Sequence, residues 1–125
     1  MKKVTILFVD DSDTIRKFIS FGLKIRGYKV ILATDGQDAL EKLAVNDVDV
    51  IITDLNMPNM DGFEFIKNLK SDDFFSKLPI IVLTTEGNKE EIEKAKKLGA
   101  DKYLIKPFKI DVIIKEIEES LSVNE

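Results

Sequence analysis

The sequence predicts an α/β domain in which a five-stranded parallel sheet is wrapped on both sides by five helices, a doubly wound fold. Three observations predict it. Short apolar runs rich in β-branched residues alternate with segments of helical periodicity. The run at 48–53 is rich in β-branched and aliphatic residues without clean polar alternation, which is typical of a parallel strand buried on both faces. The connections are short, so right-handed crossovers through the helices join consecutive strands.

The first half of the chain predicts three strands and two helices. Strands are expected at 4–9, 29–33 and 48–53, and helices at 13–26 and 35–43. Gly27 supplies the stop that follows the first helix. Asp35 can cap the second helix, and Asn46 with Asp47 turns the chain into the third strand. The third strand therefore lies in the middle of the predicted sheet.

The second half predicts three helices and two strands. The third helix carries the apolar residues Phe63, Phe65, Ile66 and Leu69, and a loop follows at 71–79. Strands are expected at 80–83 and 102–105. Asn88 with Glu91 resembles a capping box that opens the fourth helix, which stops at Gly99. The last helix carries an apolar face made of Ile110, Ile113, Ile114, Ile117 and Leu121.

Composition narrows the classes of function. At 125 residues the chain suits one domain, 1–125, with no effector domain. It has no Cys and no His, which excludes thiolate sites, imidazole catalysis and zinc sites. The net charge of −4 argues against nucleic acid as a partner. No apolar run approaches the roughly 20 residues of a membrane span, and no signal-peptide pattern opens the chain. We expect a cytoplasmic monomer that binds no membrane.

Polar side chains stand at the carboxyl ends of four predicted strands. They are Asp10 with Asp11, Asp54 with Asn56, Thr84, and Lys106. In a parallel sheet these ends lie at one edge, where ligands of open α/β sheets bind. Taken singly, each residue has a structural explanation as a helix cap, a charge partner or a strand end. Taken together, acids, a hydroxyl and an amine at one edge predict a functional site.

The predicted cluster of acids suits phosphoryl transfer. Carboxylates about 5 Å apart repel by roughly 3 kcal/mol per pair at an effective dielectric constant near 20, so the cluster needs a cation. Oxygen ligands without Cys or His favour Mg²⁺ or Mn²⁺, which also bind phosphate oxygens. Asp54 would be the nucleophile that forms an aspartyl phosphate, with Lys106 offsetting charge and Thr84 donating a hydrogen bond.

These motifs resemble the receiver domain of two-component response regulators over essentially the whole chain. The matching segments are Val9-Asp10-Asp11-Ser12, Asp54-Leu55-Asn56-Met57-Pro58-Asn59-Met60-Asp61-Gly62, Thr84-Thr85-Glu86 and Lys106-Pro107-Phe108. The chain is most similar to stand-alone, CheY-like receivers. The resemblance implies a flavodoxin-like strand order of 2-1-3-4-5.

The resemblance also implies a role for each matching residue. Asp54 accepts a phosphoryl group from a histidine kinase, so the protein is a phosphoacceptor that assists its own phosphorylation and dephosphorylation and not an enzyme. Asp11, Asp54 and the backbone carbonyl of Asn56 ligate Mg²⁺, and Asp10 acts through a bound water. Lys106, positioned by a cis peptide to Pro107, pairs with Asp54 and later with a phosphoryl oxygen. Thr84 and Tyr103 are the switch pair: the hydroxyl moves to the phosphoryl group, and the aromatic ring turns inward behind it.

Two matching positions tune the phosphoryl lifetime in this family. They are Asn56 and Glu86, and their pairing resembles the chemotaxis type, which implies a short-lived phosphoryl group. Two positions depart from the family pattern. Thr85 is larger than the usual residue beside the site and restricts access to it, and Lys109 is a poor cap for the last helix. Neither departure removes a required group.

Two surfaces are expected to meet partners. The first helix is apolar over more than half its circumference, because Phe18, Phe21 and Ile25 flank its core stripe. One interpretation is a thick core, and the other is that Ile15 and Phe18 dock a kinase helix. The resemblance implies that the fourth helix, fifth strand and fifth helix form the output face, which contacts a downstream protein.

Other functions fit the residues less well. The nearest alternative is a receiver-type intermediate that passes its phosphoryl group to a histidine phosphotransfer protein. A flavin-binding flavodoxin would need Ser, Thr and Gly where Asp10 and Asp11 stand. A phosphatase of the haloacid dehalogenase type would need an Asp general acid at position 56, and a P-loop protein would need a Gly-rich Lys motif.

Overall fold

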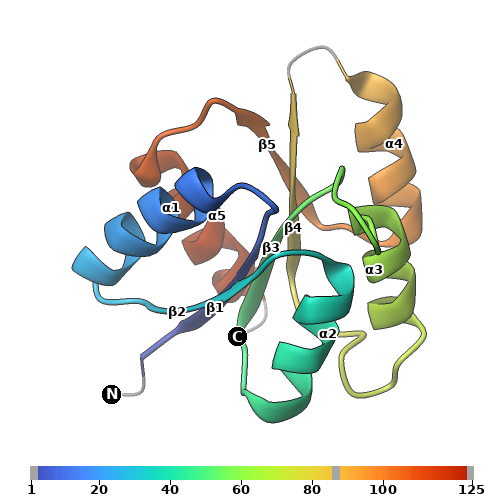
Figure 1. The fold of residues 1–125 in the computed structure, drawn as a ribbon, viewed down its shortest axis with the longest axis horizontal. Coiled ribbons are helices and arrows are strands. Elements are labelled where there is room, and N and C mark those ends of the chain that lie inside the picture. The colour runs from blue at the N-terminus through green and yellow to red at the C-terminus, as the bar shows by residue number, and fades with distance from the viewer. Residues whose placement is uncertain (1–2, 86–87, 124–125) are drawn as a thin grey trace.

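A computed structural model describes residues 3–85 and 88–123, and it contains five strands that alternate with five helices (Figure 1). The strands are β1 (Thr5–Val9), β2 (Lys29–Ala33), β3 (Val50–Asp54), β4 (Ile80–Thr85) and β5 (Lys102–Lys106). The helices are α1 (Asp13–Ile25), α2 (Gly36–Val45), α3 (Gly62–Lys70), α4 (Lys89–Leu98) and α5 (Ile110–Val123). Every predicted element is present, with boundaries displaced by at most a few residues.

All strand pairs are parallel, and the strand order is β2-β1-β3-β4-β5. The doubly wound fold and the 2-1-3-4-5 order are therefore confirmed. Strand β3 occupies the centre of the sheet, as its run of β-branched and aliphatic residues without clean polar alternation predicted. Strand β1 pairs with β2 on one side and with β3 on the other, so the direction of winding switches at β1 and the carboxyl ends of β1 and β3 are neighbours there.

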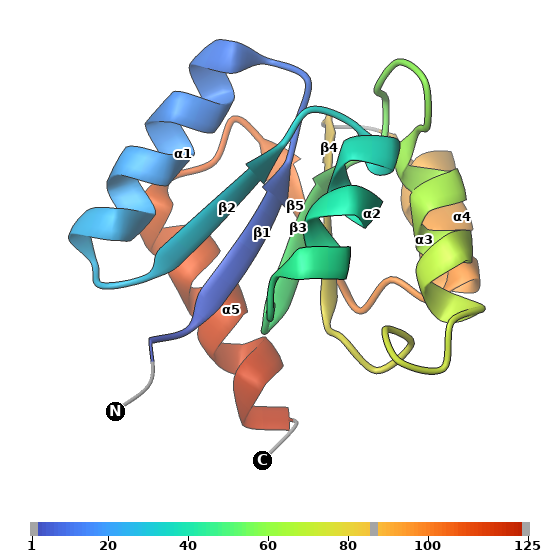
Figure 2. The ribbon, with the colours of Figure 1, turned by 60° about the horizontal axis from the view of Figure 1, so that its bottom comes forward.

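Alternation of side chains along the strands builds two cores, one on each face of the sheet. In β1, Leu7 and Val9 pack on the side of α2, α3 and α4, whereas Ile6 and Phe8 pack on the side of α1 and α5. All four are fully buried. Figure 2 shows α1 and α5 together on one face and the other three helices on the opposite face. This double burial explains why the inner strands β1, β3 and β4 consist mainly of apolar residues, whereas the edge strands β2 and β5 are partly exposed.

Side chains cap three helices at their N-termini. Ser12 accepts a hydrogen bond from the Ile15 N–H, Asp35 accepts one from Asp38, and Asp61 accepts one from Glu64. The predicted Asp35 cap is confirmed. The predicted capping box at α4 is wrong, because the Asn88 side chain makes no cap hydrogen bond. The Glu91 carboxylate instead reaches out of the helix to other partners, described below.

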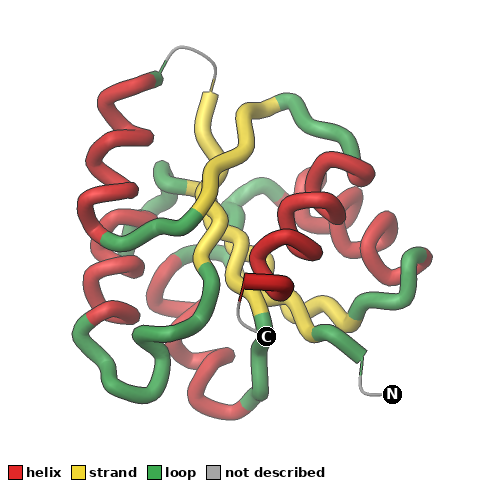
Figure 3. Tube along the Cα trace, turned by 180° about the vertical axis from the view of Figure 1, so that it is seen from behind, coloured by secondary structure: helices red, strands yellow, loops and turns green. Residues whose placement is uncertain are grey.

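Three large apolar side chains of α1 are exposed. The exposed fractions are 58% for Phe18, 70% for Phe21 and 66% for Ile25, which rules out the thick-core interpretation of this helix. The tube in Figure 3 shows the strands enclosed between helices, with loops at both ends of the sheet. Within residues 3–85 and 88–123, no helix has the length and apolarity needed to span a bilayer.

Candidate functional site

Strand register brings Asp10 and Asp54 side by side. Val9, the last residue of β1, pairs with Thr53 of β3. The residues that follow each of them are Asp10 and Asp54, so both carboxylates lie at the same edge of the sheet. Asp10 is 1% exposed and Asp54 is 9% exposed. Buried carboxylates at this spacing require compensation by a cation.

The same register brings Thr84 and Lys106 to that edge. Asp54 pairs with Leu83 of β4, which places Thr84 one residue beyond it. Further across the sheet, Thr85 of β4 pairs with Lys106, the last residue of β5. The predicted convergence of strand-end residues is therefore what the sheet produces, from four strands that are far apart in sequence.

Three carboxylates form an acidic cluster. Asp10, Asp11 and Asp54 each offer a carboxylate oxygen, and these oxygens all lie within 4.8 Å of one another. Asp11 is exposed, whereas the other two acids are buried. A set of hard oxygen ligands that is open on one side matches the preference of small divalent cations, which retain several waters when bound. The cluster can hold a cation, and its chemistry fits Mg²⁺ better than a soft metal.

Lys106 partly neutralises the cluster. Its Nζ donates to Asp10 Oδ2 and to Asp54 Oδ2, each at 3.2 Å. The sequence indicated the Asp54 pairing, and the structure adds Asp10 as a second partner. The peptide bond between Lys106 and Pro107 is cis, as the resemblance implied. One ammonium group thus serves two buried acids, and the third acid, Asp11, is exposed to solvent.

Burial raises the pKa of Asp54 above its ordinary value, and the neighbouring charge of Asp10 raises it further, although Lys106 opposes both effects. Burial by itself would lower the pKa of Lys106, but the attraction of Asp54 and Asp10 outweighs it, so the pKa of Lys106 is raised. Lys106 therefore stays protonated at neutral pH. The ionised Asp54 is held in an environment that resists its charge, and a bound cation would relieve that cost.

Backbone N–H groups orient the two buried acids. The Ser12 N–H donates to Asp10 Oδ1 at 2.9 Å, and the Leu55 N–H donates to Asp54 Oδ1 at 2.8 Å. In each acid the other oxygen, Oδ2, faces Lys106. The turn after β3 is closed by the Gly62 N–H, which donates to the Leu55 carbonyl at 2.9 Å. The acids are therefore held in fixed orientations before any ligand binds.

Thr84 and Asn56 share one partner, Glu91 of α4. The Thr84 hydroxyl donates to Glu91 Oε1 at 3.2 Å, and the Asn56 amide donates to Glu91 Oε2 at 3.0 Å. Thr84 is 3% exposed, whereas Asn56 is exposed. Tyr103 is 41% exposed, and Lys96 Nζ lies 5.3 Å from the centre of its ring. Neither switch residue of the sequence prediction is directed at Asp54 by a hydrogen bond in the described structure.

Two contributors were absent from the sequence prediction. Glu91 was assigned to a helix cap, and its sequence pattern gave no indication of the site. Arg16 of α1 donates to the Asp10 carbonyl and pairs with Asp13, which fixes the loop after β1. The i, i+3 spacing of Asp13 and Arg16 was the available sequence signal. Glu86, predicted to tune dephosphorylation, lies outside the described residues.

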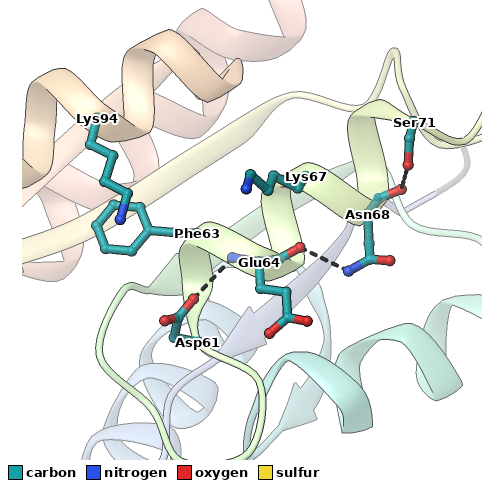
Figure 4. A pocket seen from close by; sticks show the side chains of 7 residues that line it. All are labelled: Asp61, Phe63, Glu64, Lys67, Asn68, Ser71 and Lys94. Carbon is teal, nitrogen blue, oxygen red and sulfur yellow. Dashed lines mark hydrogen bonds between the residues drawn. The ribbon is translucent and has the colours of Figure 1, made fainter.

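A hollow of about 600 Å³ between α3 and α4 is separate from the acidic cluster (Figure 4). Two of the charged side chains that line this hollow already have partners within the protein. Lys94 Nζ lies 4.2 Å from the centre of the Phe63 ring, and the Asp61 carboxylate caps α3. None of the predicted site residues lines it. A second hollow of about 410 Å³ lies beside the cluster and is lined by Ile15, Phe18, Ile19, Lys106, Pro107 and Phe108.

Comparisons with known proteins agree with this geometry. Residues 6–118 match the response regulator receiver domain family. The chain is 43% identical to chemotaxis protein CheY1 of Helicobacter pylori over 122 residues, which cover 96% of this chain and 98% of that protein. It is 41% identical to a CheY homolog of Campylobacter jejuni over 118 residues, 93% of this chain and 91% of that protein.

A solved structure shows the same fold. The chemotaxis response regulator CheY4 of Vibrio cholerae superposes with a TM-score of 0.89 at 39% identity, covering 95% of this chain and 99% of that one. The family match spans the acidic cluster, Thr84 and Lys106. The chain therefore belongs to the response regulator receiver domain family.

Proposed function

We propose that this protein is a stand-alone, chemotaxis-like response regulator that accepts a phosphoryl group on Asp54. The observation that carries the proposal is the buried pair Asp10 and Asp54 bridged by Lys106, with Asp11 completing an acidic cluster. A structural role would not need three acids at one sheet edge, since their mutual repulsion costs folding free energy. The lengths of the CheY relatives, which the chain covers almost completely, support a stand-alone role.

The cation of this site is Mg²⁺, or Mn²⁺ in its place. Asp11, Asp54 and the backbone carbonyl of Asn56 would ligate it directly, and Asp10 would act through a water. When bound, the cation neutralises charge on the phosphoryl oxygens. The three carboxylate oxygens within 4.8 Å of one another, one of them on an exposed side chain, support this assignment.

In the transfer step, a carboxylate oxygen of Asp54 attacks phosphorus as the P–N bond of a phosphohistidine breaks. The imidazole of the kinase leaves with the electron pair of that bond. Lys106 lies within hydrogen-bond distance of Asp54. As negative charge develops on the transferred group, the ammonium group can donate to a phosphoryl oxygen instead. The Thr84 hydroxyl then donates to another phosphoryl oxygen, and the Tyr103 ring turns inward behind it.

The signal leaves through the face formed by α4, β5 and α5. Phosphorylation adds up to about two negative charges beside Thr84, which biases a local two-state equilibrium. The exposed Tyr103 and Val112 lie on this face, available to a downstream protein. The chemotaxis names of the CheY relatives favour this role over that of an intermediate in a phosphorelay. We propose that the protein acts in the cytoplasm as a monomer. We expect Asn56 and Glu86 to keep the phosphoryl group short-lived.

The proposal is tested by the chemistry of the label. After incubation with acetyl phosphate and Mg²⁺, the protein should carry one phosphoryl group that hydroxylamine removes, because acyl phosphates react with this nucleophile whereas serine and threonine esters resist it. The label should map to the peptide that contains Asp54, and EDTA should prevent it. A hydroxylamine-resistant label, or a label elsewhere in the chain, would refute the proposal.

Replacing Phe18 by Ser should slow phosphoryl transfer from a histidine kinase about tenfold without changing labelling by acetyl phosphate. The exposed Phe18 ring borders the apolar hollow beside Lys106, where a kinase helix would bury it. Initial rates with both donors measure the effect. Phe74→Ser is the control, since Phe74 is 82% exposed on the loop after α3. Equal loss with both donors in Phe18→Ser would rule out docking at this position.

A further inference from the structure

One carboxylate of α4 ties together two other elements of the site. Glu91 accepts from Thr84 at the end of β4 with one oxygen and from Asn56 in the loop after β3 with the other. The bonds measure 3.2 Å and 3.0 Å. Glu91 is half-buried, so solvent competes only partly for these contacts. The end of β4, the first turn of α4 and the more distant loop after β3 therefore meet on a single side chain.

Glu91 makes these contacts in preference to a local one. The Asn88-to-Glu91 spacing suits a capping box, in which the glutamate would accept from the backbone N–H of residue 88. The Asn88 side chain makes no cap hydrogen bond, and the Glu91 oxygens bind Thr84 and Asn56. A carboxylate gains more from two side-chain donors that are partly shielded from water than from one N–H at an exposed helix end.

The contact with Thr84 excludes the contact that the proposed function requires. A threonine hydroxyl carries one proton and donates one hydrogen bond at a time. Ionised Glu91 and a phosphoryl group on Asp54 are both acceptors. Thr84 can therefore bond to Glu91 or to the phosphoryl group, but not to both.

Charge works in the same direction as this competition. A phosphoryl group on Asp54 adds up to about two negative charges. Glu91 accepts a hydrogen bond from Thr84, which follows the residue paired with Asp54, so its carboxylate lies near the phosphorylation site. The new negative charge therefore repels the Glu91 carboxylate. Losing both bonds would remove the side-chain contacts of Glu91 that hold the first turn of α4 to the end of β4 and to the loop after β3.

We propose that Glu91 is a positioning residue that holds Thr84 and Asn56 in the unphosphorylated arrangement and competes with the phosphoryl group for the Thr84 hydroxyl. When phosphorylation releases Glu91 from these two contacts, the conformational change reaches the first turn of α4. This inference rests on the proposed function, because it takes Asp54 as the phosphoacceptor. It adds to that function the contact that opposes switching and connects the site to the output face.

The test uses beryllium fluoride, which binds a carboxylate as a tetrahedral analogue of a phosphoryl group. In Mg²⁺, Glu91→Ala should bind it about five- to tenfold more tightly than the wild type, because two hydrogen bonds need not be broken first. Glu90→Ala is the matched control, since Glu90 is exposed on the same helical turn and its side chain makes no hydrogen bond or ion pair to the rest of the described chain. Its affinity should stay within twofold of the wild type.

A double-mutant cycle separates competition for the hydroxyl from simple charge removal. In a Thr84→Val background, Glu91→Ala should tighten binding by no more than about twofold, because the contested donor is gone. In nuclear magnetic resonance spectra without ligand, the Asn56 side-chain amide signals of Glu91→Ala should lie closer to those of the beryllium fluoride-bound wild type. A helix-packing role would move neither observable.

The outcomes distinguish failure of the proposed role of Glu91 from failure of the proposed phosphoacceptor role of Asp54. Equal tightening by Glu91→Ala with and without the Thr84 hydroxyl would overturn the competition, as would equal affinities of Glu91→Ala and Glu90→Ala. In either case, binding by the wild type would leave the phosphoacceptor role intact. Failure of the wild type to bind beryllium fluoride would overturn both.

Discussion

Gly62→Ala is expected to destabilise the fold by about 3 kcal/mol, a large part of the roughly 5–15 kcal/mol typical of a domain. Gly62 opens α3 directly against the end of β3. A Cβ at this position would overlap the Asp54 carbonyl oxygen and lie 2.8 Å from the Leu55 Cα. Both neighbours are backbone atoms of a buried strand end, so relief requires moving the segment that presents the Asp54 carboxylate.

Urea denaturation followed by circular dichroism measures this effect. Gly36→Ala is the matched control, because Gly36 is likewise the first residue of a helix after a capping Asp. A Cβ there would approach Met60 Cγ at 2.7 Å and Met60 Sδ at 2.9 Å, and this flexible side chain can move aside. We expect a cost of about 1 kcal/mol or less for Gly36→Ala. Equal stability losses in the two variants would show that the β3 turn does not depend on the missing side chain.

Lys106→Met is expected to lower the free energy of unfolding by about 2 kcal/mol in the absence of divalent cations. Removing the ammonium group leaves Asp10 and Asp54 without the donor they share, and Asp10 is 1% exposed. The loss is smaller than for a fully buried pair because the Lys106 side chain is 23% exposed. Methionine keeps most of the length of the side chain, which limits the loss to the charge and its hydrogen bonds.

Mg²⁺ should stabilise Lys106→Met more than the wild type, since the cluster then carries one more uncompensated negative charge and binds the cation more tightly. Thermal unfolding with and without Mg²⁺ gives the comparison. Lys102→Met is the control in the same strand, because Lys102 pairs with Glu116 and Glu119 at the protein surface. It should cost less than about 1 kcal/mol and leave the Mg²⁺ response unchanged. A Lys106→Met protein with wild-type stability and Mg²⁺ response would contradict the electrostatic account of the cluster.

The hydrophobic pattern predicted the elements and their burial because it reflects the two faces that each strand must bury. The run before Asp54 is dominated by β-branched and aliphatic residues without clean polar alternation, and every residue of β3 is buried. The pattern alone cannot order five strands, since buried parallel strands all look alike in sequence. The order 2-1-3-4-5 came from the family resemblance. Given a parallel sheet, the convergence of Asp10, Asp54, Thr84 and Lys106 followed from geometry.

The sequence could not predict which hydrogen-bond donors the Glu91 carboxylate binds. Its spacing from Asn88 fits a local cap, and its contact with Thr84 depends on how α4 packs against the end of β4. The local backbone N–H of residue 88 and the side-chain donors of other segments compete for this one carboxylate, and only the folded structure decides between them. The two interpretations of Phe18 were also open until its exposure was known. Contacts that join separate elements are therefore the part of this site that sequence reasoning misses.

The most direct test of the central claim is the intact mass after acetyl phosphate and Mg²⁺, compared between the wild type, Asp54→Asn and Asp49→Asn. Asp49 is a carboxylate just before β3 that accepts from the Thr5 N–H at the opposite end of the strand. The wild type and Asp49→Asn should each gain one phosphoryl group, and Asp54→Asn should gain none. Labelling of Asp54→Asn to the wild-type level would contradict the assignment of Asp54 as the phosphoacceptor.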